Sequence, residues 1–470
     1  MIASSGRGRQ GKIVSLSPAL GPWSLRHVIY PYVFPIVRRV PGRGIMDHVA
    51  RYDAQARWPP ERHAEQAWKR IQPLLDHAWT HVPIWREKFE SIGAEPGDIR
   101  TWADYAKIPP LTRDDLIDHP ERCIADNVPK SDRFLSLSSG STARRTSIWI
   151  DRARDPLHFA NVHFNLRWLG FEMGARNGIL WTDNARPTGY HSWNKRLKTR
   201  LLNQMLFVTN LTDDRIVRLF FRRLSRFDPE LLTVFPSVFS VFARQAERLG
   251  IPPPRVRAIV STGETLQDSH RAHFEEWTGA EVFNRYGSIE LGDVAHECPA
   301  HEGMHINANR VWVEVEQVEG LEKGLGRLLV TDLDNRACPI LRYDVGDLGR
   351  LWPTESSHAC PCGRTLPRLT EALGRHADLV KAPSGRHHCS ISFKQALLKT
   401  PGIVNAQVVH RPPRELTFRC QVNAKFPADG QQRIAQLAND QTDNEFDIRV
   451  DITDDLIRSK SGKMRMIVTL

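Results

Sequence analysis

Residues 256–284 read VRAIVSTGETLQDSHRAHFEEWTGAEVFN, a stretch in which two short apolar runs flank a helical pattern. We predict a strand at 256–260, a turn at 261–264, a helix at 269–277 and a second strand from 282. A strand, a helix and a strand in succession are typical of a βαβ unit, whose strands lie parallel in one sheet. The stretch therefore predicts an α/β fold.

The same alternation continues towards the N-terminus. Helical patterns cover residues 155–170 and 213–226, and a buried strand is expected at 231–235. Apolar residues recur at helical spacing between residues 60 and 92, and Thr112 is placed to cap a short helix. These elements extend the α/β pattern over most of the first two thirds of the chain.

The pattern changes near residue 304. Up to about residue 374, polar and apolar residues alternate with period two, which indicates antiparallel strands in a β-subdomain. We therefore expect a basic N-terminal arm (1–45), a large domain (46–374, with the β-subdomain at about 304–374) and a small α+β domain (375–470).

The composition is that of a globular protein, with 41% hydrophobic and 25% charged residues. The net charge of +11 comes from 65 Lys and Arg against 54 Asp and Glu. Because the arginines are spread along the chain, a solvated basic surface explains the charge, and we expect no nucleic acid partner. The best apolar run, Val28–Val37, is short and contains two prolines, so no membrane span is expected. With no signal-peptide pattern, the default location is cytoplasmic.

Four short segments carry candidate chemistry. The loop in LSLSSGSTARRTSIW (135–149) offers small hydroxyl residues beside two arginines, as a phosphate site requires, although taken alone it reads as a surface turn. In RYGSIE (285–290), a Tyr-Gly turn between a strand and a helix places an aromatic ring near the carboxylate of Glu290. In RYDVGD (342–347), Asp347 follows a glycine at a strand end, and SGKMR (461–465) carries a lysine. Each segment is weak evidence by itself.

The order and spacing of these segments are specific. The chain resembles the adenylate-forming superfamily, in particular the phenylacetate–CoA ligase and CapK-like family. The resemblance rests on LLDHAWTHVPIWREKF (74–89), IPPLTRDDL (108–116), SSGST (138–142), STGETL (261–266), RYGSIE (285–290), GMHI (303–306), RYDVGD (342–347), CPCGRTLPRL (360–369), GRHAD (374–378) and SGKMR (461–465).

The resemblance implies a large adenylation domain, a small mobile C-terminal domain, and a role for each matched residue. Glu290 would hold Mg²⁺, Asp378 would lie in the hinge between the domains, and Lys463 would be the catalytic residue at the α-phosphate. ATP and AMP would be bound by Ser138, Ser139, Gly140, Ser141, Thr142, Thr262, Gly263, Glu264, Tyr286, Gly287, Ser288, Asp347 and Arg375.

The sequence also departs from the family pattern. Ala143 and the arginine pair 144–145 stand where the family has a freer loop, and Ile289 replaces a hydroxyl residue unless Ser288 substitutes for it. Ala377 replaces the first of two hinge acids. These changes put the thioester-forming conformation in more doubt than ATP binding, and they leave room for a catalytically weak homologue.

Seven cysteines, an odd number, argue against a disulfide framework. Cys360 and Cys362 bracket one proline as in a metal knuckle, and some members of the resembled family carry such a site. We expect Cys298, His305, Cys360 and Cys362 to bind a structural Zn²⁺, with His301 as the substitute ligand. The alternative is a set of buried thiols and surface histidines.

The expected function is ATP-dependent, AMP-forming activation of an aryl or arylacetic acid, followed by transfer to coenzyme A. The alternatives are transfer to an amine, a hydroxyl or a carrier-protein thiol, and a non-catalytic binding protein. The phenylalanines of FPSVFSVF (235–242) would wall an acyl pocket or belong to the helix core. A homodimer is compatible with the sequence.

Overall fold

The computed structural model describes residues 44–137, 146–181, 202–209, 213–319, 321–353, 359–375, 379–385, 387–388, 400–457 and 466–470, with residues 199, 393, 396, 397 and 464. Only the backbone is described at residues 137, 371, 373–375 and 387. The expected arm lies almost wholly outside these ranges, as do Ser138–Thr142, Ala143, Asp378 and Lys463.

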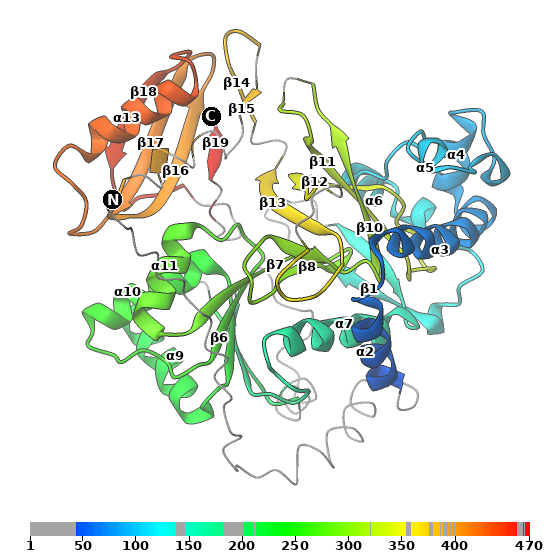
Figure 1. Cartoon of the computed structure of the whole chain (residues 1–470), viewed down its shortest axis with the longest axis horizontal. Coiled ribbons are helices and arrows are strands. Elements are labelled where there is room, and N and C mark those ends of the chain that lie inside the picture. The colour runs from blue at the N-terminus through cyan, green and yellow to red at the C-terminus, as the bar shows by residue number, and fades with distance from the viewer. Residues whose placement is uncertain are drawn as a thin grey trace, which may run out of the picture.

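The N-terminal part of the described chain is helical (Figure 1). The apolar spacing between residues 60 and 92 forms two helices that meet at Pro83, and the predicted cap is confirmed because Thr112 Oγ1 accepts a hydrogen bond from Asp115 N at 3.2 Å. The helices are α2 (Gly44–Gln55), α3 (Pro60–His81), α4 (Pro83–Glu90), α5 (Trp102–Tyr105) and α6 (Arg113–Asp118). Strands β1 (Arg133–Leu137) and β2 (Ser147–Asp151) follow as an antiparallel pair.

The predicted parallel strands form one part of an 11-stranded sheet. Five strands pair in parallel in the order β7-β6-β5-β3-β4: β3 (Asn177–Trp181), β4 (Gln204–Val208), β5 (Leu231–Val234), β6 (Ala258–Thr262) and β7 (Glu281–Ser288). Helices α7 (Arg154–Trp168), α9 (Asp214–Phe227), α10 (Pro236–Arg248) and α11 (Asp268–Thr278) connect or cover them. The predicted α/β fold is confirmed.

The remaining strands of this sheet are antiparallel, as the period-two pattern predicted. However, they continue the large sheet from β7 and do not form a separate one. They are β8 (Gly292–Glu297), β9 (Met304–Ile306), β10 (Val311–Gln317), β11 (Leu325–Asp332), β12 (Tyr343–Leu351) and β13 (Arg368–Arg375).

Two local expectations were wrong. Tyr286 and Gly287 were expected in a turn before a helix that carries Glu290, but β7 runs to Ser288 and pairs with β8 as a hairpin. Asp347 was expected at a strand end and lies inside β12. In both places, pairing with a neighbouring strand extends the strand beyond the apolar residues from which its end was predicted.

The C-terminal part is a compact α+β unit with its own core around Val408, Phe418 and Ile434. It contains β14 (Val380–Lys381), β15 (His387–His388), β16 (Ile403–Arg411), β17 (Glu415–Val422), α13 (Gly430–Gln441), β18 (Asp447–Ile452) and β19 (Ile467–Thr469). The expected α+β character of this segment agrees with these elements, and most of residues 389–399 lie outside the described ranges. In Figure 1 this unit lies above α11, and Ser269 Oγ donates to Val404 O across the contact at 3.0 Å.

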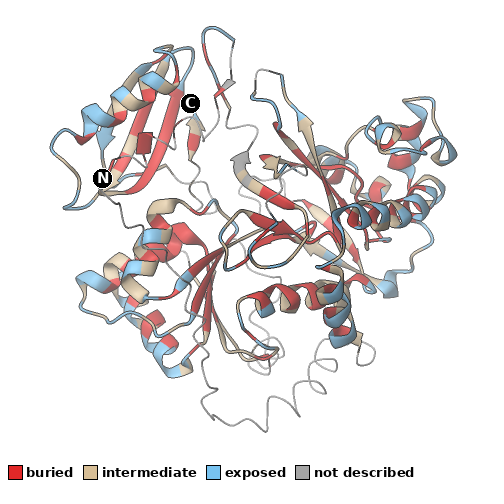
Figure 2. Ribbon diagram, viewed as in Figure 1, coloured by how far each residue is buried: buried red, intermediate tan, exposed pale blue. Residues whose placement is uncertain are grey.

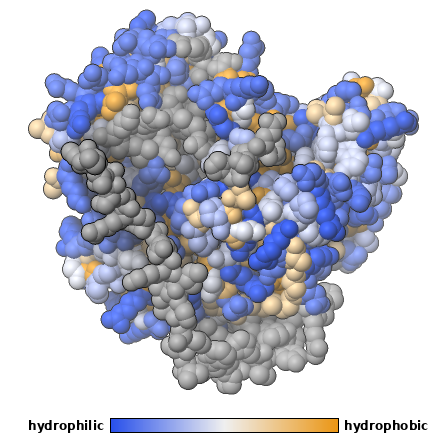
Figure 3. Space-filling model, in the orientation of Figure 1, coloured by the Kyte–Doolittle hydropathy of each residue, from blue (hydrophilic) through white to orange (hydrophobic). Residues whose placement is uncertain are grey.

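Buried residues concentrate in the central sheet and on the helix faces turned towards it (Figure 2). Phe239 and Phe242, which were considered as acyl pocket walls, pack inside this core: their ring centroids lie 4.8 Å from Phe274 and 5.3 Å from Phe220. On the face shown in Figure 3, the described surface is largely hydrophilic with scattered apolar residues. Among the described residues, no helix combines the length and hydropathy that crossing a membrane requires.

Candidate functional site

The turn after β6 carries the first group of expected ATP-binding residues. Gly263 adopts φ +79°, and a Cβ placed there would lie 2.1 Å from Phe235 Cε1, so the position requires glycine. Glu264 Oε2 accepts a hydrogen bond from Ser237 N at 3.2 Å, at the first turn of α10. The carboxylate thus binds the positive end of a helix and holds the turn against it.

Tyr286 and Asp347, expected at the base and the ribose, meet although they lie 61 positions apart. Tyr286 Oη donates a hydrogen bond to Asp347 Oδ2 over 2.9 Å, and both side chains are partly buried. Asp347 pairs in register with Arg375 of β13. The structure therefore brings these three positions together, although it does not describe the Arg375 side chain.

Gly287 and Ser288 shape the hairpin that carries Glu290. A Cβ at Gly287 would lie 2.3 Å from Gly292 O, so glycine permits the close pairing of β7 and β8. Ser288 Oγ accepts from Leu291 N at 3.3 Å within the turn. Ile289 is exposed, whereas Glu290 is buried.

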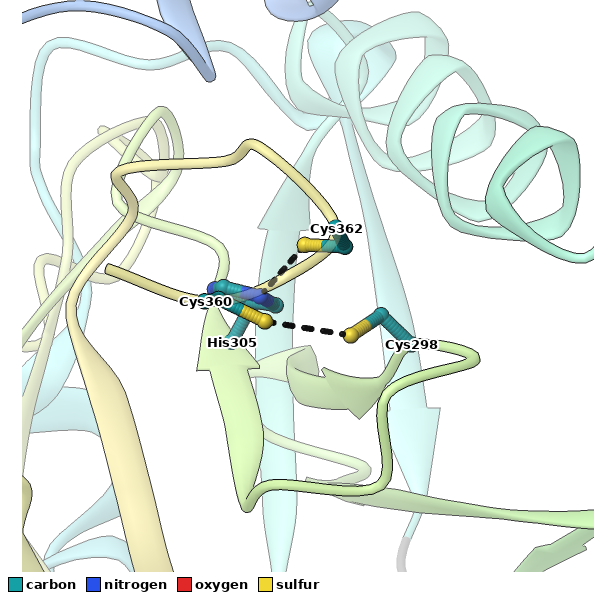
Figure 4. Close-up of side chains that lie close together, drawn as sticks. All are labelled: Cys298, His305, Cys360 and Cys362. Atoms are coloured by element: carbon teal, nitrogen blue, oxygen red, sulfur yellow. Dashed lines mark hydrogen bonds between the residues drawn. The ribbon is translucent and has the colours of Figure 1, made fainter. Parts of the chain in front are cut away.

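The predicted metal ligands converge in a single cluster (Figure 4). Cys298 directly follows β8, His305 lies on β9, and Cys360 and Cys362 lie in the loop before β13. Their ligand atoms all lie within 4.8 Å of one another, with Cys298 Sγ 3.6 Å from Cys360 Sγ and His305 Nε2 3.2 Å from Cys362 Sγ.

The geometry of this cluster fits zinc. A tetrahedral ion with Zn–S bonds of about 2.3 Å holds its ligand atoms roughly 3.5–3.8 Å apart, close to the spacing found. Hydrogen bonds from Cys298 and His305 hold the pKa of Cys362 far below its usual range. The hydrogen bond between Cys298 and Cys362 also raises the pKa of Cys298. A half-buried thiolate among thiols and an imidazole is a donor set that Zn²⁺ prefers.

His301 does not join the cluster. Its Nδ1 lies 3.4 Å from Glu297 Oε2 and 3.3 Å from Arg271 Nη1, and its ring stacks on Phe283. The histidine of the cluster is therefore His305, whose Nδ1 lies 3.2 Å from Leu366 O.

A buried charge network beside the Glu290 turn was missed by the sequence analysis. Arg154 Nε lies 2.6 Å from Asp332 Oδ2, and Arg310 Nε lies 2.6 Å from Asp334 Oδ2. Arg70 also pairs with Asp334. Burial alone would raise the pKa of Asp334, but Arg310 and Arg70 hold that pKa below its usual value.

One signal in the sequence could have indicated this network. The polar residues Arg154, His158, Asn161 and Asn165 repeat at helical spacing in α7 and so share one face. Arg154, Asn161 and Asn165 are all at most 3% exposed, so this polar face is turned inwards. A polar helix face normally points to solvent, which is why the pattern was not informative by itself.

Comparisons with known proteins agree with this fold. No model of a protein family matches the chain. A phenylacetate–coenzyme A ligase from Thermus thermophilus is 29% identical over 326 residues, 66% of this chain and 70% of the relative. A phenylacetate–coenzyme A ligase from Pseudomonas putida is 29% identical over 329 residues, with the same coverage. The CapK protein of Staphylococcus aureus is 23% identical over 53% of this chain.

The resemblance to phenylacetate–CoA ligases and CapK is thus confirmed. Among solved structures, a 2-hydroxyisobutyryl-CoA ligase in its postadenylation state aligns with a TM-score of 0.71 at 20% identity. The alignment covers 88% of this chain and 91% of that chain. At this identity the likeness establishes the fold alone, which this chain shares with that ligase.

Proposed function

We propose that this protein is an AMP-forming carboxylate ligase, which activates a carboxylic acid with ATP and transfers the acyl group to coenzyme A. The relatives named phenylacetate–CoA ligase support this proposal. The observation that carries it is the hydrogen bond between Tyr286 and Asp347, because it joins two expected nucleotide-binding residues from distant segments.

The nucleotide would lie against the turn after β6, with its base stacked on the Tyr286 ring and its ribose hydroxyls on Asp347. The bond from Tyr286 Oη fixes the ring and the carboxylate relative to each other, which reduces the ordering cost of binding. Thr262, Gly263 and Glu264 would line the base, and Arg375 would approach the ribose from β13. Ser138–Thr142 would hold the β- and γ-phosphates.

The reaction has two balanced steps. A carboxylate oxygen attacks the α-phosphorus, the bond to the bridging oxygen breaks, and pyrophosphate leaves with that electron pair. A thiolate then attacks the acyl carbonyl, and AMP leaves. In the first step anion meets anion, so cationic groups must stabilise the transition state. Lys463 would act there. Glu290 would hold Mg²⁺, which supplies positive charge to the phosphate oxygens when bound.

The acid is proposed to be aryl or arylacetic, on the basis of the relatives' names alone. The buried positions of Phe239 and Phe242 give this no support, because both side chains belong to the helix core. An acyl pocket must therefore use other residues.

Pyrophosphate exchange tests the adenylation step. Incubation with ATP and a panel of aromatic acids should give exchange that depends on the acid, and Lys463→Ala should abolish it. No exchange with any acid would favour the non-catalytic alternative, and an unchanged Lys463→Ala variant would contradict the role of Lys463.

The acceptor is tested separately, because the match to CapK and the altered residue Ala377 keep other acceptors open. Release of AMP should increase when coenzyme A is added, and mass spectrometry should detect the thioester. Exchange without any response to coenzyme A would instead favour an amine, a hydroxyl or a carrier-protein thiol.

We further infer that Cys298, His305, Cys360 and Cys362 bind one structural Zn²⁺. Four protein ligands leave no open position, so the ion would not take part in catalysis. It would tie β8 and β9 to the loop before β13. Elemental analysis of the purified protein should find about one zinc per chain.

A cytoplasmic location follows from the proposed use of ATP and coenzyme A, and fractionation of cells tests it. A homodimer stays a proposal, which sedimentation analysis would decide.

A further inference from the structure

The turn that carries Glu290 lies on helix α7. Arg154 Nη2 is 3.3 Å from Glu290 O and 2.5 Å from Leu291 O, so one guanidinium binds two successive carbonyls of the turn. Arg154 is 3% exposed, and Glu290 is also buried. These hydrogen bonds are therefore made away from bulk water, where they constrain the backbone most strongly.

Asp332, at the end of β11, holds the guanidinium of Arg154 in place through an ion pair. Arg154 Nε lies 2.6 Å from Asp332 Oδ2, and the other carboxylate oxygen lies 3.7 Å from Arg310 Nη2. Asp332 is fully buried. The ion pair offsets the charge of Arg154, so the arginine offers hydrogen-bond donors to the turn while adding little repulsion for a cation nearby.

The next turn of α7 also contacts the hairpin between β7 and β8, through His158. Gly292 has φ +76°, and a Cβ at this position would lie 2.7 Å from His158 Nδ1. His158 is one helical turn beyond Arg154, so both residues of this face touch the hairpin between β7 and β8. Helix α7 thus contacts the hairpin turn at three successive residues, Glu290, Leu291 and Gly292.

We propose that Arg154 is a positioning residue for the magnesium site, because it fixes the backbone of Glu290 and thereby aims its carboxylate. This inference rests on the proposed function. Residues that orient a metal ligand are often as necessary as the ligand, and their loss lowers metal affinity about 10- to 100-fold.

Calorimetric titration of the full chain with ATP, in the presence and absence of Mg²⁺, tests this without measuring turnover. We expect Mg²⁺ to strengthen ATP binding by the wild-type protein. Arg154→Met should reduce this Mg²⁺-dependent gain about tenfold or more, and ATP binding without Mg²⁺ should stay unchanged. Glu290→Gln should give a similar loss of the Mg²⁺-dependent gain. The double variant Arg154→Met/Glu290→Gln should lose no more of this gain than Glu290→Gln alone.

Arg342→Met is the matched control. Arg342 is as buried as Arg154, pairs with Glu314 at 3.2 Å and donates to Ile108 O, away from the Glu290 turn. The Arg342→Met variant should lose thermal stability but keep the wild-type gain in ATP binding on addition of Mg²⁺. If Arg154→Met fails to fold, Arg154→Met/Asp332→Asn also removes the buried carboxylate that has lost its Arg154 partner, and this variant should still show the weakened response.

The outcomes separate the two proposals. A wild-type response to Mg²⁺ in folded Arg154→Met or in the double variant with Asp332→Asn would overturn the positioning role, as would an equal loss in Arg342→Met. ATP binding that ignores Mg²⁺ in the wild-type protein and in Glu290→Gln would instead contradict the metal role of Glu290 in the proposed function.

Discussion

Tyr286 Oη donates a hydrogen bond of 2.9 Å to Asp347 Oδ2, which joins strand β7 to strand β12. The two strands are separated in the sheet by β8, β9 and β13, so the bond crosses between elements that are not paired. It places an aromatic face and a carboxylate where one nucleoside could contact both.

Tyr286→Phe should weaken ATP binding without removing the ring. Losing one hydrogen bond to a carboxylate costs about 1.5 kcal/mol, so we expect the KM for ATP in pyrophosphate exchange to rise roughly tenfold. Tyr286→Ala should cost a further 1–3 kcal/mol or so from lost stacking. Equal effects of the two substitutions would contradict a stacking role for the ring.

Gly263→Ala should destabilise the protein through a clash as well as through backbone strain. The new Cβ would lie 2.1 Å from Phe235 Cε1, so we expect a loss of about 3 kcal/mol in the free energy of unfolding. Gly250→Ala is the control, because Gly250 has φ +64° and open space around it, and it should cost about 1 kcal/mol. Urea unfolding measures both, and Phe235→Leu should partly rescue Gly263→Ala.

Cys362→Ser should remove zinc and lower the thermal stability by several degrees, because the ion would tie β8 and β9 to the loop before β13. Zinc content by elemental analysis and thermal unfolding with and without chelator provide the measurement. Cys420→Ser, which replaces a buried thiol on β17 in the C-terminal unit, should keep the zinc. A wild-type protein without zinc, stable towards chelator, would rule out the structural role.

Stability should fall below neutral pH partly because of His296. Burial lowers the pKa of this imidazole to about 4. Since the unfolded chain binds the proton near pH 6.5, stability is lost as the pH falls from there towards 4. At pH 5 this contribution is about 2 kcal/mol. His296→Asn should therefore show a smaller difference in unfolding free energy between pH 7 and pH 5 than the wild-type protein, and an equal difference would refute the assignment.

The sequence predicted the α/β alternation, the antiparallel section after residue 304 and the four residues that form the Cys/His cluster, because each depends on local period or residue type. It missed the hairpin at Glu290, since Gly287 looked like a turn residue. In the structure, the missing side chain of Gly287 allows the backbone of β8 to approach. A glycine signals both situations, and only the partner strand distinguishes them.

The sequence alone determined which chemical groups are available: a tyrosine, two carboxylates, three cysteines and a histidine at family positions. Only the tertiary structure decided which of them meet. It selected His305 over His301 because β9 lies beside β8, and it turned the polar face of α7 inwards onto Asp332. The contact between Tyr286 and Asp347 spans 61 positions of the chain, and the contact between Arg154 and Asp332 spans 178. Such contacts depend on strand order in the sheet, which local patterns do not encode.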